Sequence, residues 1–292
     1  MSFSKKSRAA AYLTAASLVL SLSFVACGKK PTSTTEEPAA PTAAPAEGGT
    51  AEAPAAPAAA GKGTIKGKVA FTGTAPDMPD LKREADPFCA KTPMKDQEVV
   101  VSNGALQNVA VTITKGASAG AAPASSVQTK VDQVNCMYAP RTQTAVFGQK
   151  VEIHNSDPVL HNVHTYADSK TIFNRAQPKG SPSIDKEFSK EDGSVIKFKC
   201  DVHPWMTGWL VLSDNGFNAV TGESGEFELK DVPAGTYTLQ AWHEKYGPKT
   251  VEVTVEADKT AEANFSFDGS EKVAYQFKEV DISPLFGHDH SH

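Results

Sequence analysis

The chain has 292 residues, a formal net charge of −5 and 40% hydrophobic residues. An acidic balance argues against nucleic-acid binding, which needs a basic face to neutralise phosphates, so we expect no nucleic-acid partner. The length is sufficient for one large or two small folded domains.

The first 27 residues have the composition of an export signal. Lys5, Lys6 and Arg8 are basic, residues 9–25 form a short apolar stretch, and small residues precede Cys27. This ending resembles the lipobox of bacterial lipoproteins, although Phe24 stands where leucine is usual. The resemblance implies lipidation of Cys27 and an exported protein anchored by lipid in the periplasm or cell envelope, with the outer membrane favoured. A signal anchor is the alternative, but the stretch is short and polar for a membrane span.

Residues 28–62 consist almost entirely of Ala, Pro, Thr, Glu and Gly. Such a segment cannot bury enough apolar surface to offset its conformational entropy. We therefore expect a disordered tether between the anchor and the folded part.

Three cysteines follow Cys27, namely Cys89, Cys136 and Cys200. Spare thiols tend to pair in an oxidising compartment, and one of three must remain unpaired. The first two lie in polar, loop-like surroundings, whereas Cys200 ends a strand pattern and has a histidine three residues later. We predict a Cys89–Cys136 disulfide and a metal-bound Cys200.

From residue 63 onward the chain has many strand signals and no convincing helical periodicity. Alternation over 195–200 turns the sulfur of Cys200 inward at a strand end. Further strand patterns follow at 225–229, 236–242, 250–255 and 263–267. Short strands separated by Gly/Pro turns predict an all-β protein of two sandwiches. We place the first at 63–213, with an N-terminal extension, and the second at 214–270.

The most informative residues are Cys200, His203 and Met206, which crowd three metal donors into one short loop. His161, on a distant strand, can complete the site. Two imidazoles, a thiolate and a more distant thioether form the ligand set of a mononuclear copper that alternates between Cu(I) and Cu(II). Zinc is the alternative, but a thioether is a poor zinc ligand. With no open coordination position, such a site transfers electrons and is not an enzyme.

The loop resembles that of the cupredoxins, most closely amicyanin and pseudoazurin. The match consists of Cys-x-x-His-Pro-aromatic-Met at 200–206 and His-Asn-Val-His at 161–164, and it departs at Val202, where the family often has proline. The resemblance implies a Greek-key sandwich with one type 1 copper. It carries over the ligands His161, Cys200, His203 and Met206, and beside them Asn162, Pro204 and Trp205.

Residues 217–267 resemble the carboxypeptidase regulatory-like, transthyretin-type sandwich. The matching features are the turn motifs at 225–227 and 231–237 and the strand that runs into Trp242. The resemblance implies a structural or docking module. We expect Tyr237 and Trp242 in its core.

The other histidines are expected outside the metal site. In an extended strand His164 points away from His161, and His154 alternates away from its apolar neighbours. The segment 271–292 ends in a histidine-rich tail that could capture metal ions, although an incidental tail is equally simple.

These observations favour a carrier that exchanges single electrons with redox proteins such as a c-type cytochrome or a dehydrogenase. We expect the electron to leave through an exposed edge of His203, ringed by Pro204, Trp205 and Trp209. Two alternatives remain, a copper chaperone or store, and an adhesive or docking lipoprotein whose metal is structural.

Overall fold

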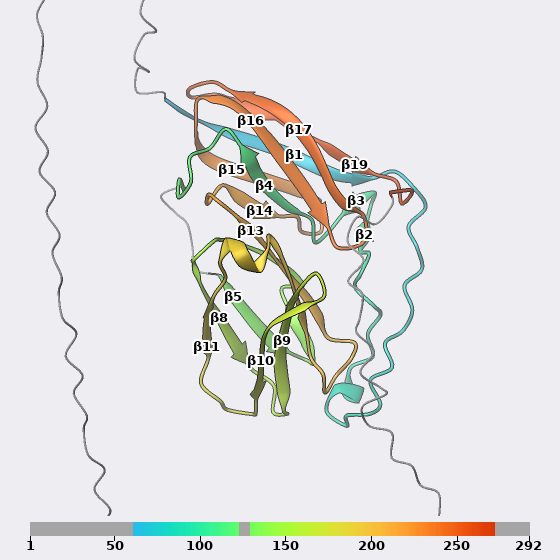
Figure 1. The fold of residues 1–292 in the computed structure, drawn as a ribbon. Coiled ribbons are helices and arrows are strands. Elements are labelled where there is room, and N and C mark those ends of the chain that lie inside the picture. Colours follow the sequence, from blue (N-terminus) through green and yellow to red (C-terminus); the bar gives the residue numbers. More distant parts are fainter. Residues whose placement is uncertain (1–60, 123–128, 272–292) are drawn as a thin grey trace, which may run out of the picture. The chain divides into compact units, whose positions relative to one another are not determined.

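The computed structural model of the chain describes residues 61–122 and 129–271, and strands dominate it (Figure 1). Within these residues the only helical segments are two 3₁₀ turns, η1 (Cys89–Lys91) and η2 (Lys190–Asp192). The predicted all-β class is therefore confirmed. The residues of the predicted export signal, Cys27 and the histidine-rich end lie outside the described residues, as does the predicted tether up to residue 60. No helix in the described part combines the length and the apolar character needed to cross a membrane.

One sandwich is built from both ends of the described chain. Strand β1 pairs antiparallel with β15 and parallel with β18 and β19. On from β1, the same sheet continues through β3 to β2. The facing sheet has the order β14-β4-β16-β17. The strands of the two sheets together are β1 (Lys62–Phe71), β2 (Val101–Ser102), β3 (Ala105–Leu106), β4 (Ala110–Lys115), β14 (Asn218–Val220), β15 (Glu226–Pro233), β16 (Gly235–His243), β17 (Gly247–Val255), β18 (Thr260–Glu262) and β19 (Phe265–Phe267). We call it the outer sandwich.

The other sandwich comes from the middle of the chain, and we call it the inner sandwich. One sheet has the order β10-β9-β12-β13-β7 and the other β11-β8-β5-β6. Its strands are β5 (Lys130–Val134), β6 (Met137–Ala139), β7 (Thr142–Val146), β8 (Lys150–Asn155), β9 (His161–Ala167), β10 (Lys170–Gln177), β11 (Ile184–Glu187), β12 (Val195–Lys199) and β13 (Thr207–Ser213).

The strand pairing does not follow the division expected from the sequence, which grouped 63–213 and 214–270. Strands β1 and β4 pair with C-terminal strands, and β3 and β2 extend the sheet of β1. The inner sandwich is therefore inserted between β4 and β14, which are themselves antiparallel neighbours. The physical reason is that period-two alternation identifies the buried face of a strand but not its partner. Gly67 illustrates the close fit, because a Cβ there would lie 1.7 Å from the carbonyl oxygen of Ala263.

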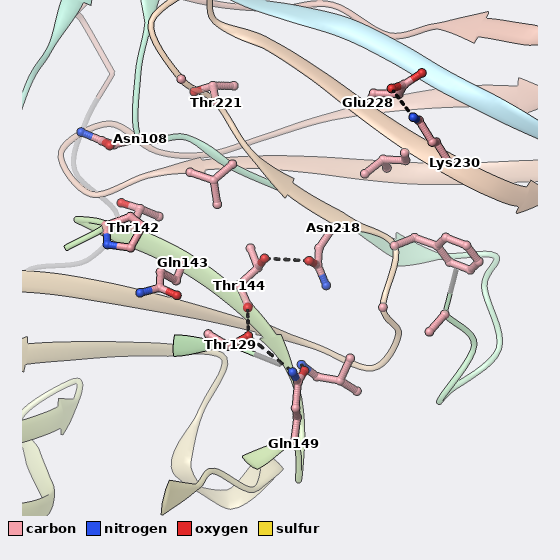
Figure 2. A pocket seen from close by; sticks show the side chains of 18 residues that line it. Asn108, Thr129, Thr142, Gln143, Thr144, Gln149, Asn218, Thr221, Glu228 and Lys230 are labelled. Atoms are coloured by element: carbon pink, nitrogen blue, oxygen red, sulfur yellow. Dashed lines mark hydrogen bonds and ion pairs between the residues drawn. The ribbon is translucent and has the colours of Figure 1, made fainter. Parts of the chain in front are cut away.

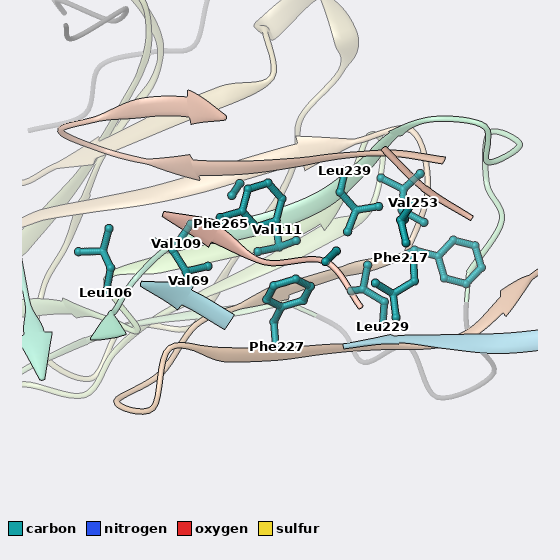
Figure 3. Close-up of a cluster of buried hydrophobic side chains, with 14 of the residues drawn as sticks. Val69, Leu106, Val109, Val111, Phe217, Phe227, Leu229, Leu239, Val253 and Phe265 are labelled. Atoms are coloured by element: carbon teal, nitrogen blue, oxygen red, sulfur yellow. The ribbon is translucent and has the colours of Figure 1, made fainter. Parts of the chain in front are cut away.

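Each sandwich has its own hydrophobic core. Figure 3 shows part of the outer core, where Val69 and Phe227 from one sheet meet Val111 and Leu239 from the other. Tyr237 is buried in this core, as predicted. The inner core contains Cys200 and Met206.

A smaller cluster contains residues of both sandwiches. Trp242 is buried as predicted, and its ring packs 5.3 Å from that of Trp209, centroid to centroid. Because Trp209 lies on β13 of the inner sandwich, the two tryptophans join the sandwiches through apolar contact.

Candidate metal centre

Three segments of the inner sandwich meet at the candidate centre. Strand β9 begins at His161, and β12 ends one residue before Cys200. Because β9 and β12 are antiparallel neighbours, the start of one lies beside the end of the other. The chain then turns through His203 back into β13, and the turn is closed by the amide of Met206, which donates to the carbonyl of His203.

The predicted donor atoms of three residues converge. The two Nδ1 atoms of His161 and His203 are 2.9 Å apart. The sulfur of Cys200 lies 3.9 Å from Nδ1 of His161 and 3.7 Å from Nδ1 of His203. A triangle with these sides has its centre about 2.1 Å from each corner, which is the length of a metal bond to imidazole or thiolate. The residues present therefore fit a metal ion.

The centre is closed to solvent. His161 and Cys200 are fully buried, and His203 is 1% exposed. Met206 is also fully buried and belongs to the same apolar cluster as Cys200. The structure thus brings three of the four expected ligands together through their donor atoms, and Met206 as the fourth ligand stays a prediction.

Asp157 supports His161 from behind. Its Oδ2 lies 2.8 Å from Nε2 of His161, and the carboxylate accepts the amides of Asn135 and Cys136 at 2.6 and 2.7 Å. Burial raises the pKa of Asp157, but these hydrogen bonds outweigh it and hold the pKa below its usual value. For His161 burial acts in the other direction and lowers the pKa, but hydrogen bonds and charge interactions with Asp157 and the Cys200 sulfur outweigh it and raise the pKa to about 9. In the absence of a metal this imidazole therefore holds a proton that a metal must displace.

Asn162 connects the two ligand-bearing segments. Its amide lies 3.5 Å from the sulfur of Cys200, and its side chain exchanges two hydrogen bonds with Asp201, of 2.8 and 2.6 Å. The hydroxyl of Tyr138 lies within hydrogen-bond distance of the carbonyls of Asn162 and Lys199. These bonds fix β9 against the end of β12.

The predicted disulfide between Cys89 and Cys136 is present, and it carries a segment of the chain onto the metal centre. Sulfur atoms of both cysteines lie within 4.8 Å of a ring nitrogen of His203. The indole nitrogen of Trp205 donates to the carbonyl of Cys136 at 3.1 Å, and its ring lies 5.1 Å from that of His203. Pro204 is exposed.

The expectation of an exposed His203 edge is wrong. Nε2 of this imidazole faces Oδ2 of Asp86 at 3.4 Å, because the segment before Cys89 covers it. Trp209 does not ring the histidine either, since it packs against Trp242. Sequence reasoning missed both Asp86 and Asp157. The predicted disulfide was the one signal that could have drawn attention to Asp86, three residues before Cys89.

Two of the other histidines, His154 and His164, lie outside the donor cluster, as expected from the sequence. His164 is partly buried, with Nδ1 at 3.0 Å from Asp201, and it stacks on Tyr166. His154 was expected to be exposed but is half-buried, with Nε2 at 2.7 Å from Glu152.

A groove of about 860 Å³ lies elsewhere and contains none of the expected ligands (Figure 2). Its lining mixes apolar residues with neutral polar ones such as Thr129, Thr144 and Asn218, and hydrogen bonds link some of the polar side chains. None of the buried donor residues lines this groove.

The fold and the donor cluster define an all-β protein with a buried cluster of potential metal ligands. Residues 210–268 match the family of carboxypeptidase regulatory-like domains. The resemblance to carboxypeptidase regulatory-like domains noted from the sequence is thus matched by a family model. No curated protein matches the chain.

Several solved structures are similar to part of the chain. A purple cupredoxin from Nitrosopumilus maritimus is 23% identical, covers 29% of this chain and 99% of its own, and has a TM-score of 0.26. A reduced amicyanin mutant is 22% identical and covers 35% of this chain and 98% of its own, with a TM-score of 0.27. A copper-containing nitrite reductase from Thermus scotoductus is 19% identical, covers 34% of this chain and 25% of its own, and has a TM-score of 0.25.

Proposed function

We propose that the protein binds one copper ion through His161, Cys200, His203 and Met206 and carries single electrons. The observation that supports this most directly is the buried triangle of two Nδ1 atoms and one sulfur. Bound copper would supply a one-electron couple between Cu(I) and Cu(II) at potentials accessible to proteins.

The chain's own residues contribute rigidity and exclusion of water. Asp157 fixes the ring of His161, and Asn162 fixes the thiolate-bearing segment, so neither donor can move freely when charge changes. Burial of His161, Cys200 and His203 excludes solvent. A donor set that stays in place keeps reorganisation small, and a closed site has no position for a substrate, which favours electron transfer over catalysis.

The proposal extends to location and partners. An export signal with lipidation at Cys27 would place the protein in the periplasm or cell envelope, favouring the outer membrane. Redox proteins such as a c-type cytochrome or a dehydrogenase are the partners that one-electron chemistry requires. A single oxidisable thiol in an oxidising compartment is consistent with protection by a metal.

The test is a copper titration of the purified protein followed by visible spectroscopy and voltammetry. We expect an intense thiolate-to-copper band at one copper per chain, reversible electrochemistry and slow release to a Cu(I) chelator. Cys200→Ser should abolish the band, and Cys89→Ser with Cys136→Ser, which leaves the ligands intact, should retain it. Absence of the band in the wild type would refute the proposal. Rapid release of Cu(I) to the chelator would favour a copper store, and preference for zinc would favour a structural metal.

A further inference from the structure

A loop of the outer sandwich reaches across to the metal centre, and we call residues 79–96 the strap. Its two ends are held together by the bridge between Asp80 and Lys95. Its middle is attached to the inner sandwich by the Cys89–Cys136 disulfide. Arg83, which is 2% exposed, adds hydrogen bonds to carbonyls on both sides of this junction.

The strap presents Asp86 to the metal centre in a fixed orientation. One carboxylate oxygen accepts the backbone amides of Phe88 and Cys89 at 2.7 and 3.2 Å. The other faces Nε2 of His203 at 3.4 Å. Because Cys89 is covalently attached to the inner sandwich, the carboxylate cannot swing away from the imidazole without breaking these bonds.

The two imidazoles of the centre are therefore supported in the same way. Nε2 of His161 faces Asp157, and Nε2 of His203 faces Asp86, which leaves both Nδ1 atoms directed at one point. A carboxylate behind a metal-bound histidine fixes its tautomer and ring orientation and makes it a stronger donor. Its negative charge also favours the more positive, oxidised state of a bound metal.

We propose that Asp86 is a positioning residue of the metal centre, which orients His203 and favours the oxidised state of bound copper. This inference rests on the proposed function. It assigns to the strap a role in setting the reduction potential, in addition to shielding the centre from solvent.

The test compares Asp86→Asn with Glu84→Gln in the copper-loaded full protein. Both substitutions remove one negative charge from the strap and keep the side-chain shape, but Glu84 is exposed and has no contact with His203. We expect Asp86→Asn to weaken Cu(II) binding relative to Cu(I) about tenfold, which corresponds to a potential higher by about 59 mV. Glu84→Gln should change the ratio less than about twofold, since exposed charges are screened.

A second comparison keeps the inference falsifiable if Asp86→Asn disturbs the strap. The disulfide is first verified in this variant by mass spectrometry of its peptides. Asp86→Asn is then combined with Cys89→Ser and Cys136→Ser, which release the strap. If Asp86 acts only when the strap holds it, the substitution should have no additional effect on the potential in that background.

The outcomes separate the inference from the function on which it rests. A wild type with the thiolate-to-copper band, but equal potentials in Asp86→Asn and Glu84→Gln, would overturn the role of Asp86 alone. An equal effect of Asp86→Asn with and without the disulfide would also overturn it. A wild type without the band would overturn both proposals.

Discussion

The ion pair between Arg141 and Glu244 joins the inner to the outer sandwich, and its removal should destabilise both. The pair is bidentate, and its two side chains are 6% and 5% exposed. The indole of Trp209 donates to the same carboxylate at 2.8 Å. Burial raises the pKa of Glu244, while the charge of Arg141 opposes that rise. Without Glu244, Arg141 would keep only Asp96, at 3.7 Å, as an ionic partner, and without Arg141 the buried carboxylate of Glu244 would keep only the indole of Trp209.

The magnitude follows from that asymmetry. Removing one partner of a buried ion pair costs about 3 to 5 kcal/mol, because the other charge stays buried. We therefore expect Glu244→Gln and Arg141→Met each to lower the free energy of unfolding by about this amount. The double variant should cost no more than one single substitution, since it leaves neither charge of the pair behind.

The assay is urea unfolding of the metal-free protein at pH 7, followed by tryptophan fluorescence and circular dichroism. The matched control is the exposed pair of Lys66 and Glu228, whose side chains are 58% and 36% exposed. Glu228→Gln should lower the free energy of unfolding far less than Glu244→Gln, because water and salt screen an exposed ion pair. Additive losses in the Arg141 and Glu244 variants, or a loss from Glu244→Gln no larger than the control, would refute the reasoning.

Three further outcomes are expected. Cys89→Ser with Cys136→Ser should lower the free energy of unfolding by about 4 kcal/mol, given a sequence separation of 47 residues, and an unchanged urea midpoint would contradict this. Burial, followed by the nearby cations, lowers the pKa of His243 to about 3. Since the unfolded histidine binds a proton near pH 6.5, the free energy of unfolding should be constant above that pH and fall as the pH drops towards 3. In acid unfolding curves, His243→Phe should make this decline less steep. Gly67→Ala should shift the thermal midpoint downward by several degrees, because a Cβ would meet the carbonyl of Ala263, and Gly148→Ala, with no neighbour within 4 Å, tests the strain of a positive φ alone.

The sequence was sufficient for features that depend on local spacing. Cys200 and His203 are close because three residues in a turn cannot separate far, and the strand alternation before them sets the direction of the sulfur. The disulfide could be predicted by elimination, because Cys200 was expected to bind a metal and only Cys89 and Cys136 were left to pair. These inferences need no knowledge of which strands pair.

Features that depend on long-range pairing could not be predicted. Asp86 is 117 positions from His203, and only the folded strap brings their side chains together. The same limit applies to β1, whose alternation indicated a buried face but not that β15, β18 and β19 lie beside it. The predicted exposed edge of His203 is likewise absent, because the strap, which is distant in sequence, covers that imidazole.

Insertion explains why the strap can act on the metal centre. The outer sandwich is closed by strands from before and after the inner one, so β4 and β14 lie side by side and hold both ends of the insertion. Cys89–Cys136 and Arg141–Glu244 are then two further links between the sandwiches, one covalent and one ionic. A strap attached at one end only would sample many orientations, whereas a loop fixed in the outer sandwich and tied to the inner one has few. The same links that stabilise the chain therefore hold Asp86 against His203, and a change that loosens them should be detectable at the metal centre before the fold is lost.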